Sequence, residues 1–164
     1  MTPQDSAEHA TRRWRVDRVE IAVDTAVGMT MRGRFRRATG SYQVEADGIE
    51  VELVVDASSF ETGNTLLDGF LRSTDSRRLA EHPEVRFRSA RVRNSGNGRL
   101  RIEGSVEAAG KVETVVFDAE AKPVGAGLRL DAVASVDGAR LGKSAERFAM
   151  FLPATLQVTA HLTP

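Results

Sequence analysis

The chain contains no cysteine, and aromatic residues make up only 5% of it. The absence of cysteine excludes disulfides, thiol catalysis and zinc sites built on thiolates. No window reaches the roughly 18 apolar residues that a membrane-spanning helix requires. The start of the chain, "MTPQDSAEHATRRW", has no apolar run of the kind found in a secretory signal. We therefore expect a cytoplasmic protein without a membrane span.

Neither sign of charge predominates, because 23 basic residues balance 23 acidic residues. A nucleic-acid-binding protein normally carries a basic surplus, so no nucleic-acid partner is predicted. The three histidines, His9, His82 and His161, lack the spacing of metal ligands, so no metal site is predicted. The length of 164 residues fits one globular domain. We expect a loose polar tail over residues 1–13 and a single domain over residues 14–164.

Short segments of alternating apolar and polar residues, separated by turn signals, fill most of the chain. Turns such as "NSGNG" indicate successive hairpins and therefore an antiparallel meander. A long meander removes its exposed edges by closing on itself. The predicted fold is all-β, a closed antiparallel barrel of eight strands. These strands lie within residues 14–23, 28–35, 49–56, 85–92, 100–108, 112–121, 128–136 and 155–162.

Two local features depart from regular alternation. The phase slips near Ser89 or Ala90, which indicates a β-bulge. The segment 64–83, "NTLLDGFLRSTDSRRLAEHP", has apolar residues at helical spacing and ends at a proline, which stops a helix. We predict one or two short helices that cap one end of the barrel. Their apolar stripe consists of Leu66, Leu67, Phe70 and Leu71.

The predicted inward rows are rich in small residues such as Gly104, Ala132 and Ala134. Small inward residues leave volume inside an eight-stranded barrel, which is wide enough for its own side chains or one small ligand. Either an elongated apolar ligand or the helical segment and loops would fill this volume, and both interpretations stay open from the pattern alone.

Four stretches, in order along the chain, are similar to motifs of one family. They are "WRVD" at 14–17, "ASSFETGN" at 57–64, "LDGFLRSTDSRRLAEHPEVRF" at 67–87 and "IEGSVEAAGKVETVVF" at 102–117; "VDGARLG" at 136–142 is a weaker fifth. Together they resemble the YceI-like family of lipocalin-like barrels associated with binding of polyisoprenoid lipids. The resemblance implies a lipocalin-like barrel, a lipid with a polyprenyl tail and a homodimer. Leu67 and Phe70 stand where the family usually has Arg and often has His.

The predicted function is binding of an extended apolar lipid, of polyisoprenoid or isoprenoid-quinone type, by a carrier or sequestering protein. Desolvation of tail methylenes, at roughly 0.8 kcal/mol each, supplies the binding energy without a catalytic residue. "GAGLRL" at 125–130 lacks the third glycine and the helix of a dinucleotide site, so it predicts a hairpin and no cofactor. The predicted ligand-binding residues are Phe35, Val51, Leu53, Phe60, Leu67, Phe70, Leu71, Phe87, Ile102, Phe117 and Phe148.

Two alternative functions remain. One is an interaction module whose barrel is filled by its own side chains. The other is a hydrolase acting on a lipid-like substrate, with a triad drawn from Ser58 or Ser59, His82 and Asp68, although no G-x-S-x-G elbow supports it.

The basic residues Arg32, Arg34 and Arg36 share one strand face. We expect a solvated outer face paired with Glu50 and Glu52, and an anionic head group or membrane surface is the competing interpretation.

Overall fold

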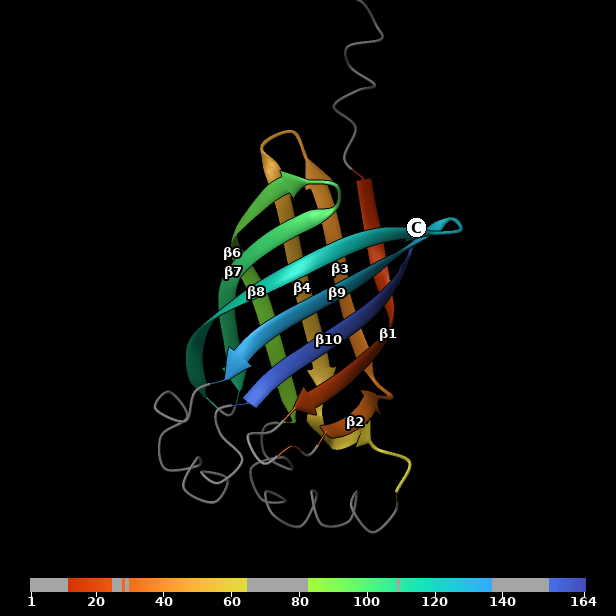
Figure 1. The fold of residues 1–164 in the computed structure, drawn as a ribbon, viewed down its shortest axis with the longest axis vertical. Coiled ribbons are helices and arrows are strands. Elements are labelled where there is room, and N and C mark those ends of the chain that lie inside the picture. The colour runs from red at the N-terminus through yellow and green to blue at the C-terminus, as the bar shows by residue number, and fades with distance from the viewer. Residues whose placement is uncertain (1–11, 25–27, 29, 65–82, 109, 137–153) are drawn as a thin grey trace, which may run out of the picture.

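A computed structural model describes the chain except for residues 1–11, 25–27, 29, 65–82, 109 and 137–153. The described part consists of β-strands and one turn of 3-10 helix, η1 (Ala57–Ser59) (Figure 1). The strands are β1 (Arg12–Asp24), β2 (Thr30–Phe35), β3 (Ala38–Glu45), β4 (Gly48–Asp56), β5 (Phe60–Glu61), β6 (Glu84–Gly96), β7 (Arg99–Ala108), β8 (Lys111–Val124), β9 (Gly127–Val136) and β10 (Ala154–Thr163).

Eight of these strands form a closed antiparallel ring. The order around the ring is β1, β3, β4, β6, β7, β8, β9, β10, and β10 pairs again with β1. Because every ring strand has two neighbours, the barrel has no free edge around its circumference. The prediction of a closed eight-stranded barrel is confirmed. The predicted capping helices, with Leu67, Phe70 and Leu71, lie outside the described residues.

The sequence pattern missed one strand of the ring, β3. The predicted strands at 28–35 and 49–56 correspond to β2 and β4, and β3 lies between them. β1 pairs with β2 along its C-terminal half and with β3 along its N-terminal end, so β2 and β3 together occupy one position in the wall. The alternation of β3 is weak because Gly40 and Ser41 precede Tyr42, the only buried residue of the strand. The predicted number of ring strands was right, but the prediction counted the segment of β2 and omitted β3.

The predicted bulge in β6 is confirmed. The register between β6 and β7 shifts between Ser89 and Arg91. On its other side β6 pairs with β4 only from Glu52 to Asp56. Just beyond the last pair, the backbone N–H of Val51 donates a hydrogen bond to Ser89 Oγ at 2.8 Å. The serine hydroxyl therefore satisfies the backbone where the ladder between β4 and β6 stops.

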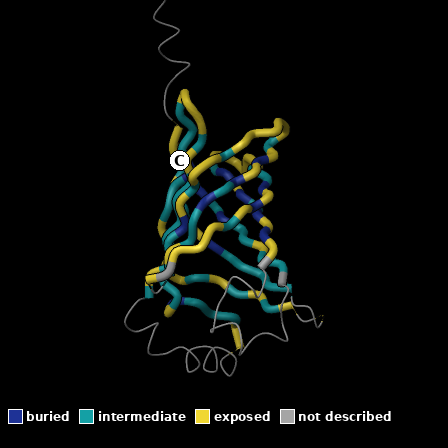
Figure 2. The backbone as a smooth tube through the Cα atoms, turned by 90° about the vertical axis from the view of Figure 1, so that its left-hand side faces the viewer, coloured by how far each residue is buried: buried dark blue, intermediate teal, exposed yellow. Residues whose placement is uncertain are grey.

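The core lies inside the ring. It is built from the residues at every second position of each strand, whose side chains point inward. Figure 2 shows buried stretches alternating with exposed ones along the strands, as the period of two requires. Phe87 and Phe117 meet edge to face within this core, with ring centroids 5.4 Å apart. The buried apolar residues of this cluster are Val19, Tyr42, Phe87, Leu100, Ile102, Phe117, Ala119, Leu128, Leu130, Ala132, Ala134, Ala160 and Leu162.

Two glycines in apolar rows are covered by phenylalanine rings. A Cβ placed on Gly104 would lie 2.7 Å from the Phe87 ring and closer still to the carbonyl oxygen of Arg88. A Cβ on Gly33 would likewise overlap the ring of Phe60. Aromatic rings packed over strand glycines are a known device for filling such gaps. The small side chain of Gly104 predicted unfilled volume inside the barrel, and in the structure the ring of Phe87 occupies this volume.

We expect Gly104→Ala to lower the free energy of unfolding by roughly 1–3 kcal/mol, the usual cost of overpacking a close-packed core. The added methyl group has no space between the Phe87 ring and the β6 backbone. The neighbouring Ser105→Ala, at a half-buried position, is the control and should change stability little. Urea denaturation of the three proteins measures the effect, and equal midpoints for Gly104→Ala and wild type would contradict the close approach.

Candidate functional site

A cavity of about 70 Å³ occupies the interior of the barrel. Every strand of the closed ring contributes to its wall, so the cavity is the lumen of the barrel rather than a surface groove. The wall is almost wholly apolar. Its lining residues are Val16, Ser41, Tyr42, Val51, Glu52, Leu53, Phe87, Ile102, Phe117, Leu130, Ala132, Val158, Ala160 and Leu162.

The size of the cavity limits what it can hold. At roughly 10–15 Å³ for each water-sized group, it seats about five to seven such groups. That is a short stretch of hydrocarbon chain and not a whole polyprenyl tail. The Phe87 ring, which covers Gly104 and meets Phe117, takes up part of the lumen. A genuinely apolar cavity stays dry, so an apolar group that enters it displaces no bound water.

Five of the predicted ligand-binding residues lie on the cavity wall: Val51, Leu53, Phe87, Ile102 and Phe117. All five were selected because the alternating pattern of their strands predicts that their side chains point into the barrel. Their contact with a ligand stays a prediction.

The remaining predicted ligand-binding residues do not line the cavity in the described structure. Phe35 and Phe60 pair across β2 and β5, with ring centroids 5.2 Å apart. Phe60 covers Gly33 there, so its ring serves the packing of β5 against β2. Leu67, Phe70, Leu71 and Phe148 lie outside the described residues.

The sequence-based selection missed several wall residues. The alternating pattern of β9 and β10 does predict that these residues face the interior, but the selection favoured aromatic residues and the capping segment. The missed wall residues are Leu130, Ala132, Val158, Ala160 and Leu162. The inward-facing positions of the alternating pattern were the signal that could have identified these residues.

Tyr42 was missed because its strand was missed. Its side chain is 6% exposed, and its ring meets that of Trp14 edge to face at 5.9 Å. Trp14 and Tyr42 are direct register partners on β1 and β3. Burial raises the pKa of the Tyr42 hydroxyl above its ordinary value of 10.0, because the ionised form loses hydration.

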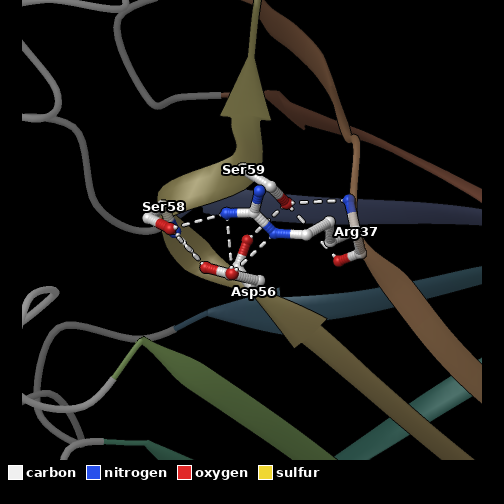
Figure 3. A network of polar contacts seen from close by, with 4 residues as sticks. All are labelled: Arg37, Asp56, Ser58 and Ser59. Carbon is white, nitrogen blue, oxygen red and sulfur yellow. Dashed lines mark hydrogen bonds and ion pairs between the residues drawn. The ribbon is translucent and has the colours of Figure 1, made fainter.

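A polar cluster joins the bend between β2 and β3 to the end of β4 (Figure 3). Asp56 caps η1 by accepting hydrogen bonds from the backbone N–H and the hydroxyl of Ser58. Arg37 Nε donates to the same carboxylate at 2.9 Å. The Ser59 hydroxyl accepts from the Arg37 backbone N–H at 3.0 Å and donates to the Asp56 carbonyl at 2.6 Å. The cluster fixes the corner where the chain leaves the barrel wall.

The pKa of Asp56 is lowered from its ordinary value of 3.8, first by the hydrogen bond from the Ser58 hydroxyl. The Arg37 guanidinium and the Ser58 backbone N–H lower it further, and partial desolvation opposes them. The ionised carboxylate is therefore part of the folded corner.

The two serines of the hypothetical hydrolase triad both belong to this cluster. Ser58 donates to Asp56, and Ser59 is held between Asp56 and Arg37. His82 and Asp68 lie outside the described residues. The described contacts give both hydroxyls a structural role and place no base beside them.

The arginines of β2 lie on the solvated outer face, as predicted, but with different partners. Arg34 pairs with Glu61 of β5 at 2.7 Å. Glu52 instead lies near Arg86 and Arg88 of β6. The predicted pairing with Glu50 and Glu52 was wrong because β3, which was not predicted, and β1 lie between β4 and β2 in the sheet.

The described residues hold no group of three or more His, Asp or Glu side chains placed to bind a metal ion. They also include no helix with the length and hydropathy needed to cross a membrane.

Comparisons with known proteins match both the sequence and the fold. A family model described as the YceI-like domain matches residues 13–163. A UPF0312 protein of Vibrio parahaemolyticus is 30% identical over 100 residues, which cover 59% of this chain and 52% of the relative. A UPF0312 protein of Shewanella denitrificans is 32% identical over 91 residues, which cover 53% of this chain and 47% of the relative. The chain thus spans about half the length of the curated relatives it matches.

Solved structures with the same fold share little sequence. BcnA of Burkholderia cenocepacia superposes with a TM-score of 0.70 at 18% identity, covering 90% of this chain and 98% of that one. A polyisoprenoid-binding domain from Saccharophagus degradans, implicated in plant cell wall breakdown, gives a TM-score of 0.59 at 14% identity, with 91% and 95% covered. At these identities the likeness shows the fold alone.

We expect Asp56→Ala to cost roughly 0.5–2 kcal/mol of stability at neutral pH, the usual value of a helix N-cap. Because the folded-state pKa is lowered, this stabilisation is present above the ordinary pKa of 3.8 and is lost as the pH falls through the lowered value. Urea denaturation at neutral and at strongly acidic pH measures it. Glu50→Ala, an exposed change on the same strand, is the control. An equal loss at both pH values would contradict a role for the ionised carboxylate.

The single tyrosine makes the titration of Tyr42 directly observable. In the folded protein we expect its phenolate absorbance to develop at a higher pH than in the urea-unfolded chain, where the pKa returns to about 10. Because the folded-state pKa is raised, burial of the neutral phenol stabilises the fold below pH 10.0, and this contribution is lost as the pH rises through the folded-state pKa. Identical midpoints for the folded and unfolded chain would show that Tyr42 is not desolvated.

Proposed function

The chain belongs to the YceI-like domain family, and we propose that it binds an extended apolar lipid of polyisoprenoid type inside its barrel, as a carrier or sequestering protein. The observation that carries this proposal is the apolar lumen to which every ring strand contributes. The fold shared with a polyisoprenoid-binding domain supports the choice of ligand class.

The energetics indicate how such a ligand must sit. Five to seven methylene-sized groups at roughly 0.8 kcal/mol each give about 4–6 kcal/mol. Without any cost of association, that energy corresponds to a dissociation constant of about 1 mM to tens of micromolar. Tight binding therefore requires a tail longer than the described cavity, with further apolar groups buried at the end of the barrel or by enlargement of the lumen.

The small residues of β9 and β10 leave the space in the lumen that a lipid tail can occupy. Ala132 and Ala160 are buried, line the cavity and present only a methyl group to it. A larger side chain at either position would fill the space that a lipid tail needs. These residues therefore offer a way to close the cavity without changing the outer surface.

A barrel filled by its own side chains is the second candidate function, as an interaction module. Its supporting observation is the modest volume of the cavity together with the ring of Phe87 packed over Gly104. The two candidates differ in one measurable property, the uptake of a lipid.

We expect native mass spectrometry of the purified full chain to show a one-to-one complex with an added C20 prenyl alcohol. Ala132→Leu should abolish the complex because the added side chain occupies the lumen. Val133→Leu, whose position is 42% exposed on the same strand, should retain it. Circular dichroism verifies that both variants are folded. Absence of any lipid complex with the wild-type chain would reject lipid binding and favour the interaction module.

A further inference from the structure

The β6–β7 hairpin concentrates one sign of charge in a protein whose total charge is balanced. Residues 85–102 contain six arginines and no acidic residue, although the whole chain holds 23 basic and 23 acidic side chains. The four arginines nearest the turn of the hairpin are all exposed. These four residues, which form the basic tip, are Arg91, Arg93, Arg99 and Arg101.

The bulge in β6 turns the arginines of this strand outward. Phe87 before the bulge is buried in the core, and Val92 after it packs against the same core. Because successive side chains of a regular strand point to opposite faces, an odd spacing such as this would send one of the two outward. The register shift between Ser89 and Arg91 corrects the phase. Arg91 and Arg93, the residues on either side of Val92 or next to it in phase, therefore face the solvent.

The arginines of β7 face the same way and meet a like charge. Arg99 and Arg101 flank the buried Leu100, so their side chains point outward. Arg101 lies directly opposite Arg93 in the ladder between the two strands. Like charges directly opposite each other destabilise a sheet. The fold therefore carries a repulsive pair here that its own packing does not need.

The acidic residues nearby leave most of the basic tip without a partner. Within the described part of the chain, Arg101 is the only tip residue with an ion pair, to Glu103 of its own strand at 3.6 Å. Asp118 and Glu120 of β8 lie opposite Arg101 and Arg99 in register, but the described structure shows no ion pair between these strands. The other three guanidinium groups of the tip are thus open to an anion from outside.

The hairpin differs along its length. Arg86, which lies nearer the start of β6, is placed between Glu52 at 3.5 Å and Glu84 at 3.6 Å. The ladder between β4 and β6 ends at the pair Glu52 and Arg88, so the basic tip extends beyond it. Figure 1 shows the turn between β6 and β7 at the same end of the barrel as the turn between β3 and β4. The tip is therefore presented at one end of the barrel, where a flat surface can meet it.

An anionic bilayer is the partner that these features fit best. Arginine binds phosphate groups through parallel hydrogen bonds, and anionic lipids present such groups as a continuous layer. Each basic side chain near such a surface strengthens binding about fivefold. A nucleic acid is a poorer fit because the chain has no overall basic surplus. A carrier of an apolar lipid must also meet a membrane to load or release its ligand.

We propose that the basic tip docks the barrel reversibly on an anionic membrane surface. The purpose of this docking rests on the proposed function, since it names where a lipid carrier meets the membrane, but the docking itself needs no bound lipid. Four arginines at about fivefold each, opposed by the charge of Glu103, give an attraction on the order of a hundredfold. Attraction of this size permits release, and salt screens it.

Co-sedimentation of the full chain with vesicles tests the proposal, and no vesicle contains a prenyl lipid. At about 0.1 M salt we expect binding to phosphatidylcholine vesicles with about one-third phosphatidylglycerol, none to pure phosphatidylcholine, and loss of binding at about 1 M salt. Arg93→Gln/Arg99→Gln should weaken binding about 25-fold, because it removes two charges. The urea midpoint of this variant should stay unchanged or rise, because Arg101 no longer faces a like charge.

Two further variants are the controls. Arg93→Lys/Arg99→Lys keeps both charges and should retain binding. Arg32→Gln/Arg36→Gln removes the same charge from two exposed arginines that likewise lack an ion pair among the described residues. Figure 1 shows β2 towards the other end of the barrel, so this variant should bind like the wild type. A loss of binding in this variant instead would move the docking surface to β2 and overturn the proposal.

The remaining outcomes separate docking from lipid binding. No binding of the wild type to anionic vesicles, or equal binding by Arg93→Gln/Arg99→Gln, would overturn the proposal while uptake of a prenyl alcohol could stand. Binding of a polyglutamate peptide without binding to vesicles would assign the tip to an acidic protein and would also overturn it. A chain that docks through the tip but takes up no prenyl alcohol would keep this inference and lose the proposed function.

Discussion

The pairing of β1 with β10 is the interaction on which the rest of the structure depends. It extends from Arg15 opposite Thr163 to Asp24 opposite Thr155 and joins the first described strand to the last. Without it the meander would have two free edges and the interior rows would face water on one side. With it, the inward residues of all ring strands face one another, and the lumen exists. Because its two strands are far apart in sequence, closure is a non-local step in assembling the fold.

The sequence predicted the barrel well because its two main signals are physical requirements. Alternation with a period of two identified most ring strands, and the cost of open edges favoured closure. The slip near Ser89 also predicted the observed bulge correctly. β3 escaped because Gly40 and Ser41 interrupt its apolar row, and the pairing of the outer arginines was consequently wrong. A strand with few apolar residues is recognisable only once its neighbours are known, since its pairing is decided by tertiary contacts.

The lumen was predictable in part for the same reason. Val51, Leu53, Phe87, Ile102 and Phe117 follow from the inward phase of their strands. Phe35 and Phe60 are aromatic like several wall residues, yet they pair with each other across β2 and β5 and do not line the described cavity. A phenylalanine that covers a strand glycine cannot be distinguished by sequence from one that lines a cavity. Tyr42, which lines the cavity beside Trp14, was missed because it lies on the strand that the pattern did not identify.

The ladder between β4 and β6 covers only part of each strand. Only the pairs from Glu52 to Asp56 join these strands, whereas β7 and β8 pair continuously from Arg99 to Ala108. Val51, Leu53 and Phe87 flank this junction and also line the lumen. The two strands are therefore held together here by apolar packing inside the lumen as well as by the backbone ladder.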